Sequence, residues 1–106
     1  MKRYDIRWAS LDPAEGSEMR KTRPVVIVSL DELNVHLQTV VICPLTSQLH
    51  PAWRCRLQTL CGKQPAEIAV DQIRAISKSR LGARIGKLPD GQAAALRRLI
   101  TEMYGD

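Results

Sequence analysis

The 106-residue, 11.9 kDa chain is 44% hydrophobic and 25% charged, which is typical of one globular domain over residues 1–106 and excludes disordered and fibrous classes. No apolar run approaches the ~20 residues that span a bilayer, and the start, MKRYDIRW, lacks the apolar centre of a signal peptide, so we expect a cytoplasmic protein. The net charge of +5 suggests a polyanionic partner, although aromatic residues that would stack on bases are few.

The first half of the chain predicts three strands. Residues 4–8, YDIRW, alternate apolar with charged side chains, which is the period of a half-buried strand. The continuous apolar runs at 25–30 and 39–45 indicate central strands that are buried on both faces. The segment at 29–34 can form one helical turn between them.

The second half predicts further strands and one helix. Side chains at 53–58 alternate between apolar positions and positions that are basic or amide, and a strand at 66–71 becomes irregular after Gln72. In the tail, apolar residues recur on one helical face over 96–103, Asp90 can cap the start, and Gly105 suits a left-handed cap. Five or six short strands and a terminal helix describe a mainly β fold, a small, strongly twisted antiparallel barrel with the helix packed against it.

A polar loop joins the first two predicted strands. It begins at the turn Asp12-Pro13, contains Gly16, which permits a positive φ, and ends at Arg23-Pro24, because the residue before a proline is restricted to extended conformations. After Gly16 the loop carries one carboxylate and three cations, and such a loop can stabilise a developing anion. An ordinary solvated connector is the alternative. These charged residues are Glu18, Arg20, Lys21 and Arg23.

The excess of positive charge lies in the second half of the chain. Residues 1–53 carry six Lys/Arg and six Asp/Glu, whereas residues 54–106 carry ten and five. Most of these cations fall on or between predicted strands, so a basic face across the sheet is expected. They are Arg54, Arg56, Lys63, Arg74, Lys78, Arg80, Arg84 and Lys87.

The cysteines indicate neither disulfides nor a metal site. Cys43, Cys55 and Cys61 form an odd set without CxxC spacing, which predicts reduced thiols that serve packing. With His50 they fit no standard zinc spacing. His50 lies four residues past Thr46, where it can reach a substrate, although we do not assign it a direct role.

Five short motifs follow one another in the chain: GSE at 16–18, RP at 23–24, PLTS at 44–47, DQIR at 71–74 and RLGARIGKL at 80–88. This set, in this order and over nearly the whole chain, resembles the MazF/PemK family of toxin endoribonucleases. The resemblance implies an SH3-like barrel with a C-terminal helix, a fold shared with the CcdB gyrase poisons. It also implies a homodimer that cleaves single-stranded RNA without a metal or other cofactor, and a cognate antitoxin, expected as an acidic, partly disordered chain over the basic face.

Three residues match the family's catalytic positions. Arg23 matches its catalytic arginine, Thr46 its catalytic threonine, and Glu18 the acidic residue of its first loop. In one plasmid-borne branch a histidine follows the loop glycine and an arginine precedes the DQ motif by two residues. Ser17 and Ala69 occupy those positions here, so proton-transfer roles given to those two groups do not transfer.

Metal-free scission of RNA can use the substrate's own 2′-OH as the nucleophile, so the protein must supply a proton acceptor, a proton donor and charge for the phosphate. Arg23 can bind the phosphate bidentately, and Thr46 can hydrogen-bond a nonbridging oxygen. Glu18 can accept the 2′-proton or orient Arg23 through an ion pair, and both alternatives stay open.

Other polar side chains in these motifs are candidates for binding RNA. Asp71 and Gln72 can hydrogen-bond base edges and Arg74 can contact phosphate, although Asp71 fits a turn-stabilising role equally well. The full set of predicted substrate contacts is Ser17, Ser47, Gln48, Asp71, Gln72 and Arg74.

Two other classes of function stay open. A non-catalytic poison would bind DNA gyrase as the CcdB relatives do, but those relatives end their helix in Trp-Gly-Ile, whereas this chain ends in MYGD at 103–106. A basic barrel could also bind RNA without cutting it. The combination of Glu18, Arg23 and Thr46 favours cleavage.

Overall fold

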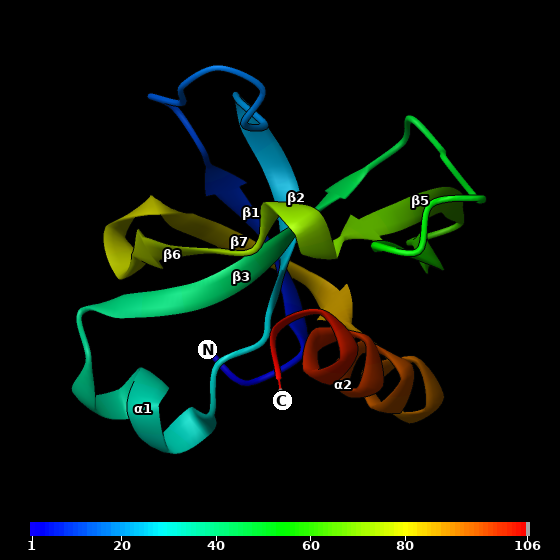
Figure 1. The fold of residues 1–106 in the computed structure, drawn as a ribbon. Helices are drawn as coiled ribbons and strands as arrows, with labels where there is room; N and C mark the ends of the chain where they lie inside the picture. The colour runs from blue at the N-terminus through cyan, green and yellow to red at the C-terminus, as the bar shows by residue number, and fades with distance from the viewer. Residues whose placement is uncertain (106) are drawn as a thin grey trace.

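One strongly curled antiparallel sheet makes up most of the molecule (Figure 1). The structure, a computed structural model, describes residues 1–105. Its elements in chain order are β1 (Asp5–Ser10), β2 (Thr22–Ile27), α1 (Asp31–His36), β3 (Thr39–Thr46), β4 (Arg56–Cys61), β5 (Gln64–Ala69), η1 (Val70–Gln72), β6 (Arg74–Ser77), η2 (Lys78–Arg80), β7 (Leu81–Lys87) and α2 (Asp90–Tyr104).

The order of the strands is β4-β5-β3-β2-β1-β7, and the long strand β3 organises it. One edge of β3 pairs with β2, while the other pairs with β6 along Thr39–Ile42 and with β5 at Leu45 and Thr46. The ends of this path are β4 and β7, so the sheet forms a half-barrel. The predicted mainly β, antiparallel fold with a C-terminal helix is confirmed.

Both faces of the central strands are buried, as their continuous apolar runs predict. On β2, Val25 and Ile27 belong to one apolar cluster, with Leu11 and residues of β3 and β6. Val26 belongs to the second cluster, together with Leu96 of α2. The sheet therefore separates two cores, and α2 covers the second one.

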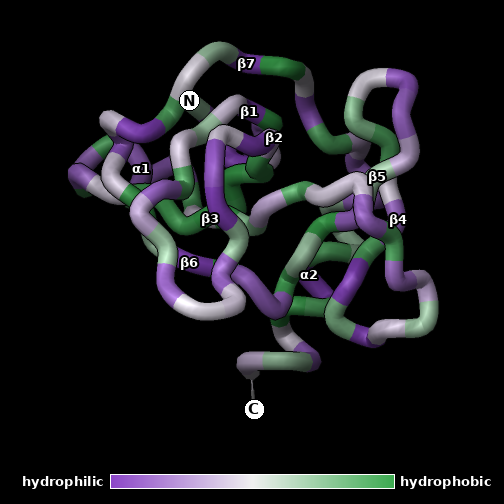
Figure 2. The backbone as a smooth tube through the Cα atoms, turned by 90° about the horizontal axis from the view of Figure 1, so that it is seen from above, coloured by the Kyte–Doolittle hydropathy of each residue, from purple (hydrophilic) through white to green (hydrophobic). Residues whose placement is uncertain are grey.

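The helix α2 packs through one face, with Ala93 and Leu96 buried, and Figure 2 shows hydrophobic and hydrophilic segments alternating along it. Both predicted caps are wrong. Asp90 is the first helical residue, Pro89 precedes it without a side-chain capping bond, and the acid instead complements the helix dipole. Gly105 is extended, at φ −86°, and its N–H donates to Thr101 O at 2.8 Å. No helix within residues 1–105 is long and apolar enough to cross a membrane.

Strand boundaries differ from the predictions where tertiary pairing decides them. The strand β2 begins at Thr22, so Arg23 lies on a strand, paired with Ala9, and not in the loop. The strand β4 begins only at Arg56, because the chain turns at Trp53, whose N–H donates to His50 O at 2.9 Å. The sequence does not predict β6 and β7; glycines at 82 and 86 and an irregular register against β1 obscure the period of β7.

Two predicted local features are confirmed. Gly16 has a φ of +57°, and one short helix, α1, lies between β2 and β3. A glycine that the prediction overlooked, Gly62, has a φ of +64° and makes the tight turn between β4 and β5. Positive φ favours glycine because it has no Cβ.

Leu96→Ala should lower the free energy of unfolding by about 3 kcal/mol, because a fully buried leucine that touches the sheet leaves a cavity. Urea unfolding followed by circular dichroism measures this. Val35→Ala is the control, because its side chain on α1 is 76% exposed, and it should change the stability by less than about 0.5 kcal/mol. Equal losses in both variants would contradict the packing of α2 on the sheet.

Candidate active site

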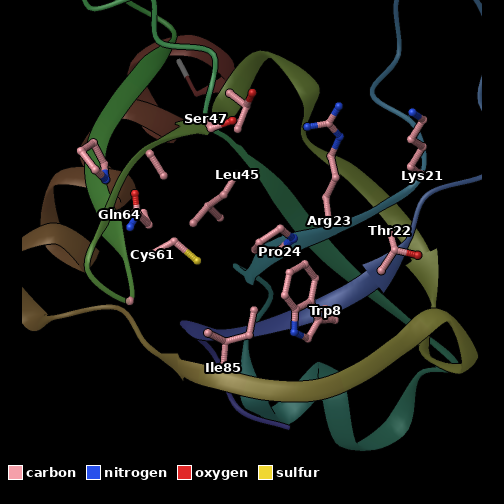
Figure 3. A pocket seen from close by; sticks show the side chains of 14 residues that line it. Trp8, Lys21, Thr22, Arg23, Pro24, Leu45, Ser47, Cys61, Gln64 and Ile85 are labelled. Atoms are coloured by element: carbon pink, nitrogen blue, oxygen red, sulfur yellow. The ribbon is translucent and has the colours of Figure 1, made fainter.

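A pocket of about 560 Å³ opens where β2, the end of β3 and the β4–β5 turn meet (Figure 3). We call it the Arg23 pocket. It is lined by Trp8, Lys21, Thr22, Arg23, Pro24, Leu45, Thr46, Ser47, Cys61, Gly62, Gln64, Pro65, Ala66 and Ile85.

Arg23 presents a guanidinium to this pocket from a strand. Its Nε donates to Arg20 O at 2.9 Å, which orients the group. Its two terminal nitrogens make no hydrogen bond within the described residues. In Figure 3 the side chain extends from β2 at the same end of the pocket as Ser47. The guanidinium can therefore donate in parallel to two oxygens of a phosphate.

Thr46 is the last residue of β3, and only 6% of it is exposed. Its Oγ1 accepts the backbone N–H of Gln48 at 3.1 Å. A hydroxyl that accepts one bond keeps its own proton to donate. Thr46 and Arg23 thus bring two kinds of hydrogen-bond donor to one pocket.

The remaining walls of the pocket are largely apolar. Trp8, which is 44% exposed, lies opposite Pro24 in the β1–β2 ladder, and Leu45 and Ile85 line the wall near it. An exposed indole can stack on a base or a ribose. From the sequence, Trp8 is predicted only as a strand residue; the pairing of β1 with β2 is what places it beside the RP motif.

A second, polar cavity of about 290 Å³ lies beside η1. We call it the Glu18 cavity. The β1–β2 loop closes over it, because Met19 N–H donates to Gln72 Oε1 at 3.2 Å and Glu18 Oε1 accepts Glu15 N–H at 2.7 Å. Five of its lining residues come from the predicted site, and the full lining is Glu15, Ser17, Glu18, Asp71, Gln72, Ile73 and Arg74.

The structure therefore divides the predicted site residues between two cavities. Arg23, Thr46 and Ser47 share the Arg23 pocket, whereas Glu18 lies in the other cavity and forms no ion pair with Arg23. Gln48 lines neither cavity, and its backbone bonds to Thr46.

Arg74 and Asp71, in the Glu18 cavity, differ in how their charges are satisfied. Asp71 accepts two hydrogen bonds from Arg56, at 2.8 and 3.4 Å, which favours a structural role for its carboxylate. Arg74 Nη1 is buried and has no hydrogen-bond partner among residues 1–105. The Arg74 guanidinium thus keeps a donor to spare in this cavity.

A buried carboxylate that the sequence analysis missed, Glu67 on β5, lies opposite Thr46 in the β3–β5 ladder. It has no exposed surface and accepts hydrogen bonds from Gln58 Nε2 at 2.7 Å, Arg56 Nη1 at 3.3 Å and the backbone N–H of His50. Burial raises the pKa of Glu67, but these bonds outweigh it and hold the pKa below its usual value. The carboxylate is therefore charged in the folded protein.

The expected basic face across the sheet is smaller than the sequence suggests. Arg56, expected on the solvent side, has only 7% of its side chain exposed and pairs with Glu67 and Asp71. Three other cations are also engaged: Arg54 with Glu102, Arg84 with Asp5, and Arg80 with two backbone carbonyls. Predicted cations with neither an ion pair nor these backbone contacts in the described part of the chain are Lys63, Arg74, Lys78 and Lys87.

His50 and the cysteines are placed outside any metal cluster. The His50 ring stacks on Trp53, with centroids 3.8 Å apart, and lines neither cavity. Burial, with a smaller effect of the Asp71 charge, raises the pKa of Cys43 to about 12, so it stays a thiol. No three His, Cys, Asp or Glu side chains within residues 1–105 are grouped as metal ligands would be.

Comparison with known proteins decides the family. A family described as PemK-like, MazF-like toxins of type II toxin-antitoxin systems matches residues 2–104. The chain belongs to this family. The endoribonuclease MazF of Staphylococcus saprophyticus is 31% identical, over 99% of this chain and 92% of that protein. This MazF-like toxin is accordingly an endoribonuclease, as its motifs predict, and the gyrase-poison alternative is set aside.

Solved structures agree with this fold. The Mycobacterium tuberculosis toxin MazF-mt6 is 26% identical, covers 94% of this toxin and 95% of its own chain, and superposes with a TM-score of 0.79. An endoribonuclease from a mycobacterial species, solved in complex with its cognate antitoxin, is 18% identical and shares the fold at a TM-score of 0.82, with 99% and 95% of the two chains covered.

The depressed pKa values of Glu67 and Asp71 predict acid lability of this toxin. Burial raises the pKa of Asp71, but its bonds and charge contact with Arg56 outweigh this. A group with a lowered folded-state pKa contributes stability above its unfolded pKa, about 4 for these acids, and loses it as the pH falls through the folded value. The contribution of these two carboxylates to the free energy of unfolding should therefore be constant between about pH 7 and 5 and should decrease below about pH 4.

Urea unfolding at neutral and acid pH measures this loss. Glu67→Gln should flatten the acid side of the profile, because the charge that must be protonated is gone. Glu102→Gln is the matched control, since its pair with Arg54 is exposed on both sides and contributes little. An identical acid slope for wild type and Glu67→Gln would contradict the assignment.

Proposed function

We propose that this single toxin domain, residues 1–106, cleaves single-stranded RNA at selected sequences without a metal, leaving 2′,3′-cyclic phosphate and 5′-OH ends, and thereby inhibits translation and growth. The observation that supports it is that Arg23 and Thr46 line one pocket with hydrogen-bond donors to spare. A pocket with apolar walls strengthens such donors, because little water screens them.

In this mechanism the substrate supplies its own nucleophile. The 2′-oxygen attacks the adjacent phosphorus while the bond from phosphorus to the 5′-oxygen breaks, so one proton leaves the 2′-OH and one reaches the 5′-oxygen. Arg23 holds two phosphate oxygens and stabilises their growing charge, and the Thr46 hydroxyl donates to a nonbridging oxygen. A water in the Arg23 pocket accepts the 2′-proton, because Glu18 lines the other cavity, and water also supplies the proton that reaches the 5′-oxygen. Glu18 is the alternative acceptor, which requires the β1–β2 loop to bring its carboxylate to the 2′-oxygen.

Neighbouring nucleotides occupy the rims of both cavities. Ser47 and Gln48 lie beside the Arg23 pocket, where they contact the sugar and phosphate backbone. In the Glu18 cavity, the amide of Gln72 and the hydroxyl of Ser17 bind base edges, and Arg74 binds phosphate. Asp71 contributes a base contact only with the oxygen lone pairs that Arg56 leaves free.

We further propose that the toxin acts in the cytoplasm as a homodimer and is silenced by a cognate acidic antitoxin. The mycobacterial relative solved with its antitoxin supports the second partner. A net charge of +5 favours an acidic chain. Covering the Arg23 pocket would suffice to stop cleavage.

Arg23→Ala should lower cleavage of RNA by roughly 100-fold or more while the protein stays folded, because one positioned donor to a developing anion is worth that much. A fluorogenic RNA library and a thermal melt measure the two properties. Arg98→Ala is the matched control: it removes the same charge from an exposed position on α2 and should cleave at nearly the wild-type rate. An Arg23→Ala variant that cuts as fast as Arg98→Ala would remove Arg23 from the mechanism.

Purified toxin should cleave RNA in excess EDTA, and the products should carry a cyclic phosphate and a free 5′-OH, because the proposed nucleophile is internal to the substrate. A substrate with a single 2′-deoxy nucleotide at the cleaved position should stay intact while still competing for binding. Mass spectrometry of the fragments reads the ends directly. Cleavage of the deoxy substrate, or loss of activity in EDTA, would disprove this chemistry.

A further inference from the structure

Glu67 lies beside the point where β3 ends and the next loop begins. It lies on β5, opposite Thr46 in the ladder, and is completely buried. A buried carboxylate destabilises a fold unless hydrogen bonds satisfy its oxygens. The residues that donate these hydrogen bonds show which segments the Glu67 side chain connects.

The three donors to Glu67 come from the loop at residues 47–55 and from β4, the strand that follows it. From within the loop, the backbone N–H of His50 donates to one oxygen. From β4, Arg56 Nη1 and Gln58 Nε2 donate at 3.3 and 2.7 Å. One carboxylate therefore ties the loop to the first residues of the strand into which it leads.

The start of the same loop shapes the pocket. Ser47 lines the Arg23 pocket, and Gln48 N–H donates to Thr46 Oγ1 at 3.1 Å. This bond uses one acceptor position of the hydroxyl and so limits the directions in which Thr46 can donate. A shift of the His50 backbone would move Gln48, and with it the Thr46 hydroxyl.

We propose that Glu67 is a positioning residue for RNA cleavage, holding the 47–55 loop through His50 and Arg56 so that the Thr46 hydroxyl and Ser47 keep their places in the Arg23 pocket. The inference rests on the proposed role of this pocket. Replacing a buried ion pair by apolar side chains is often neutral or stabilising, so stability alone does not explain the carboxylate.

The loop carries its own reporter. Trp53 stacks on His50 with an angle of 7° between the rings, and the Arg56 guanidinium lies 4.8 Å from its centroid. Trp8 is the second of the two tryptophans in the chain. In a Trp8→Phe background the emission of Trp53 alone therefore reports the position of the loop, whether or not RNA is cut.

The experiment compares Glu67→Gln and the apolar double variant Arg56→Leu/Glu67→Val with Asp5→Asn. Asp5 is the matched control, because it is also a buried carboxylate paired with an arginine, Arg84, at 3.2 Å, and it lines neither cavity of the site. All variants are assayed well below their melting temperatures, and kcat and KM are measured with a short RNA.

We expect kcat to fall roughly 10- to 100-fold in Glu67→Gln and in the double variant, as a small misplacement of a reacting group produces. Trp53 emission should shift in both, whereas Asp5→Asn should change neither readout. A folded double variant with wild-type kcat would overturn the proposal. Glu67→Gln with wild-type kcat and unshifted emission would overturn it as well. This second comparison decides the question if the double variant does not fold.

Thr46→Val separates failure of this inference from failure of the proposed function. If Thr46→Val cleaves as the wild type does, the proposed role of Thr46 is wrong, and the emission of Trp53 in Glu67→Gln still tests whether Glu67 holds the loop. If Thr46→Val is inactive and Glu67→Gln is not impaired, the positioning role of Glu67 alone is wrong.

Discussion

The ion pairs of Arg56, with the buried Glu67 and the partly exposed Asp71, hold β4, β5 and η1 together. They connect β4, β5 and the short helix η1, three elements that the chain places far from β2 and its arginine. Asp71 and Gln72 lie together in η1, and Gln72 accepts a bond from the β1–β2 loop, so Arg56 helps to hold the Glu18 cavity, while its partner Glu67 lies opposite Thr46 of the Arg23 pocket. A single guanidinium thus links the walls of two sites.

The curl of the sheet brings the residues of the Arg23 pocket together. β2 brings Arg23 to the pocket, β3 ends at Thr46 in its wall, and the β4–β5 turn contributes Cys61, Gly62 and Gln64. Apolar side chains such as Leu45 and Ile85 fill the space around these groups. The result is a few aligned donors in a poorly hydrated environment, in which the field acting on a phosphate is stronger than at an open surface.

Local pattern was sufficient for much of this arrangement. The uninterrupted apolar runs of β2 and β3 predict central strands because only such strands bury both faces, and Gly16 predicts the positive φ of its loop. The motifs that carry the family resemblance predict that Arg23, Thr46 and Glu18 belong to one site, and the pocket contains the first two but not Glu18.

The predictions that were wrong concern contacts between segments that lie far apart in the chain. The alternation of side chains predicts that Arg56 faces solvent on its strand. The alternation does not reveal that Glu67 and Asp71 lie within bonding distance of it. Glu67 itself looks like one acid on an exposed face. The separation of Glu18 from Arg23 is equally non-local, because it depends on how the β1–β2 loop docks on η1.

Arg23 is carried by a strand that is paired on both sides, to β1 and to β3, and Thr46 ends a strand of the same sheet. The two donors are therefore in place before any substrate arrives, and no folding step is needed to bring them together. If they perform the cleavage proposed above, the folded toxin is active whenever its pocket is open. An inhibitor then has to cover the pocket, and its departure is enough to restore activity.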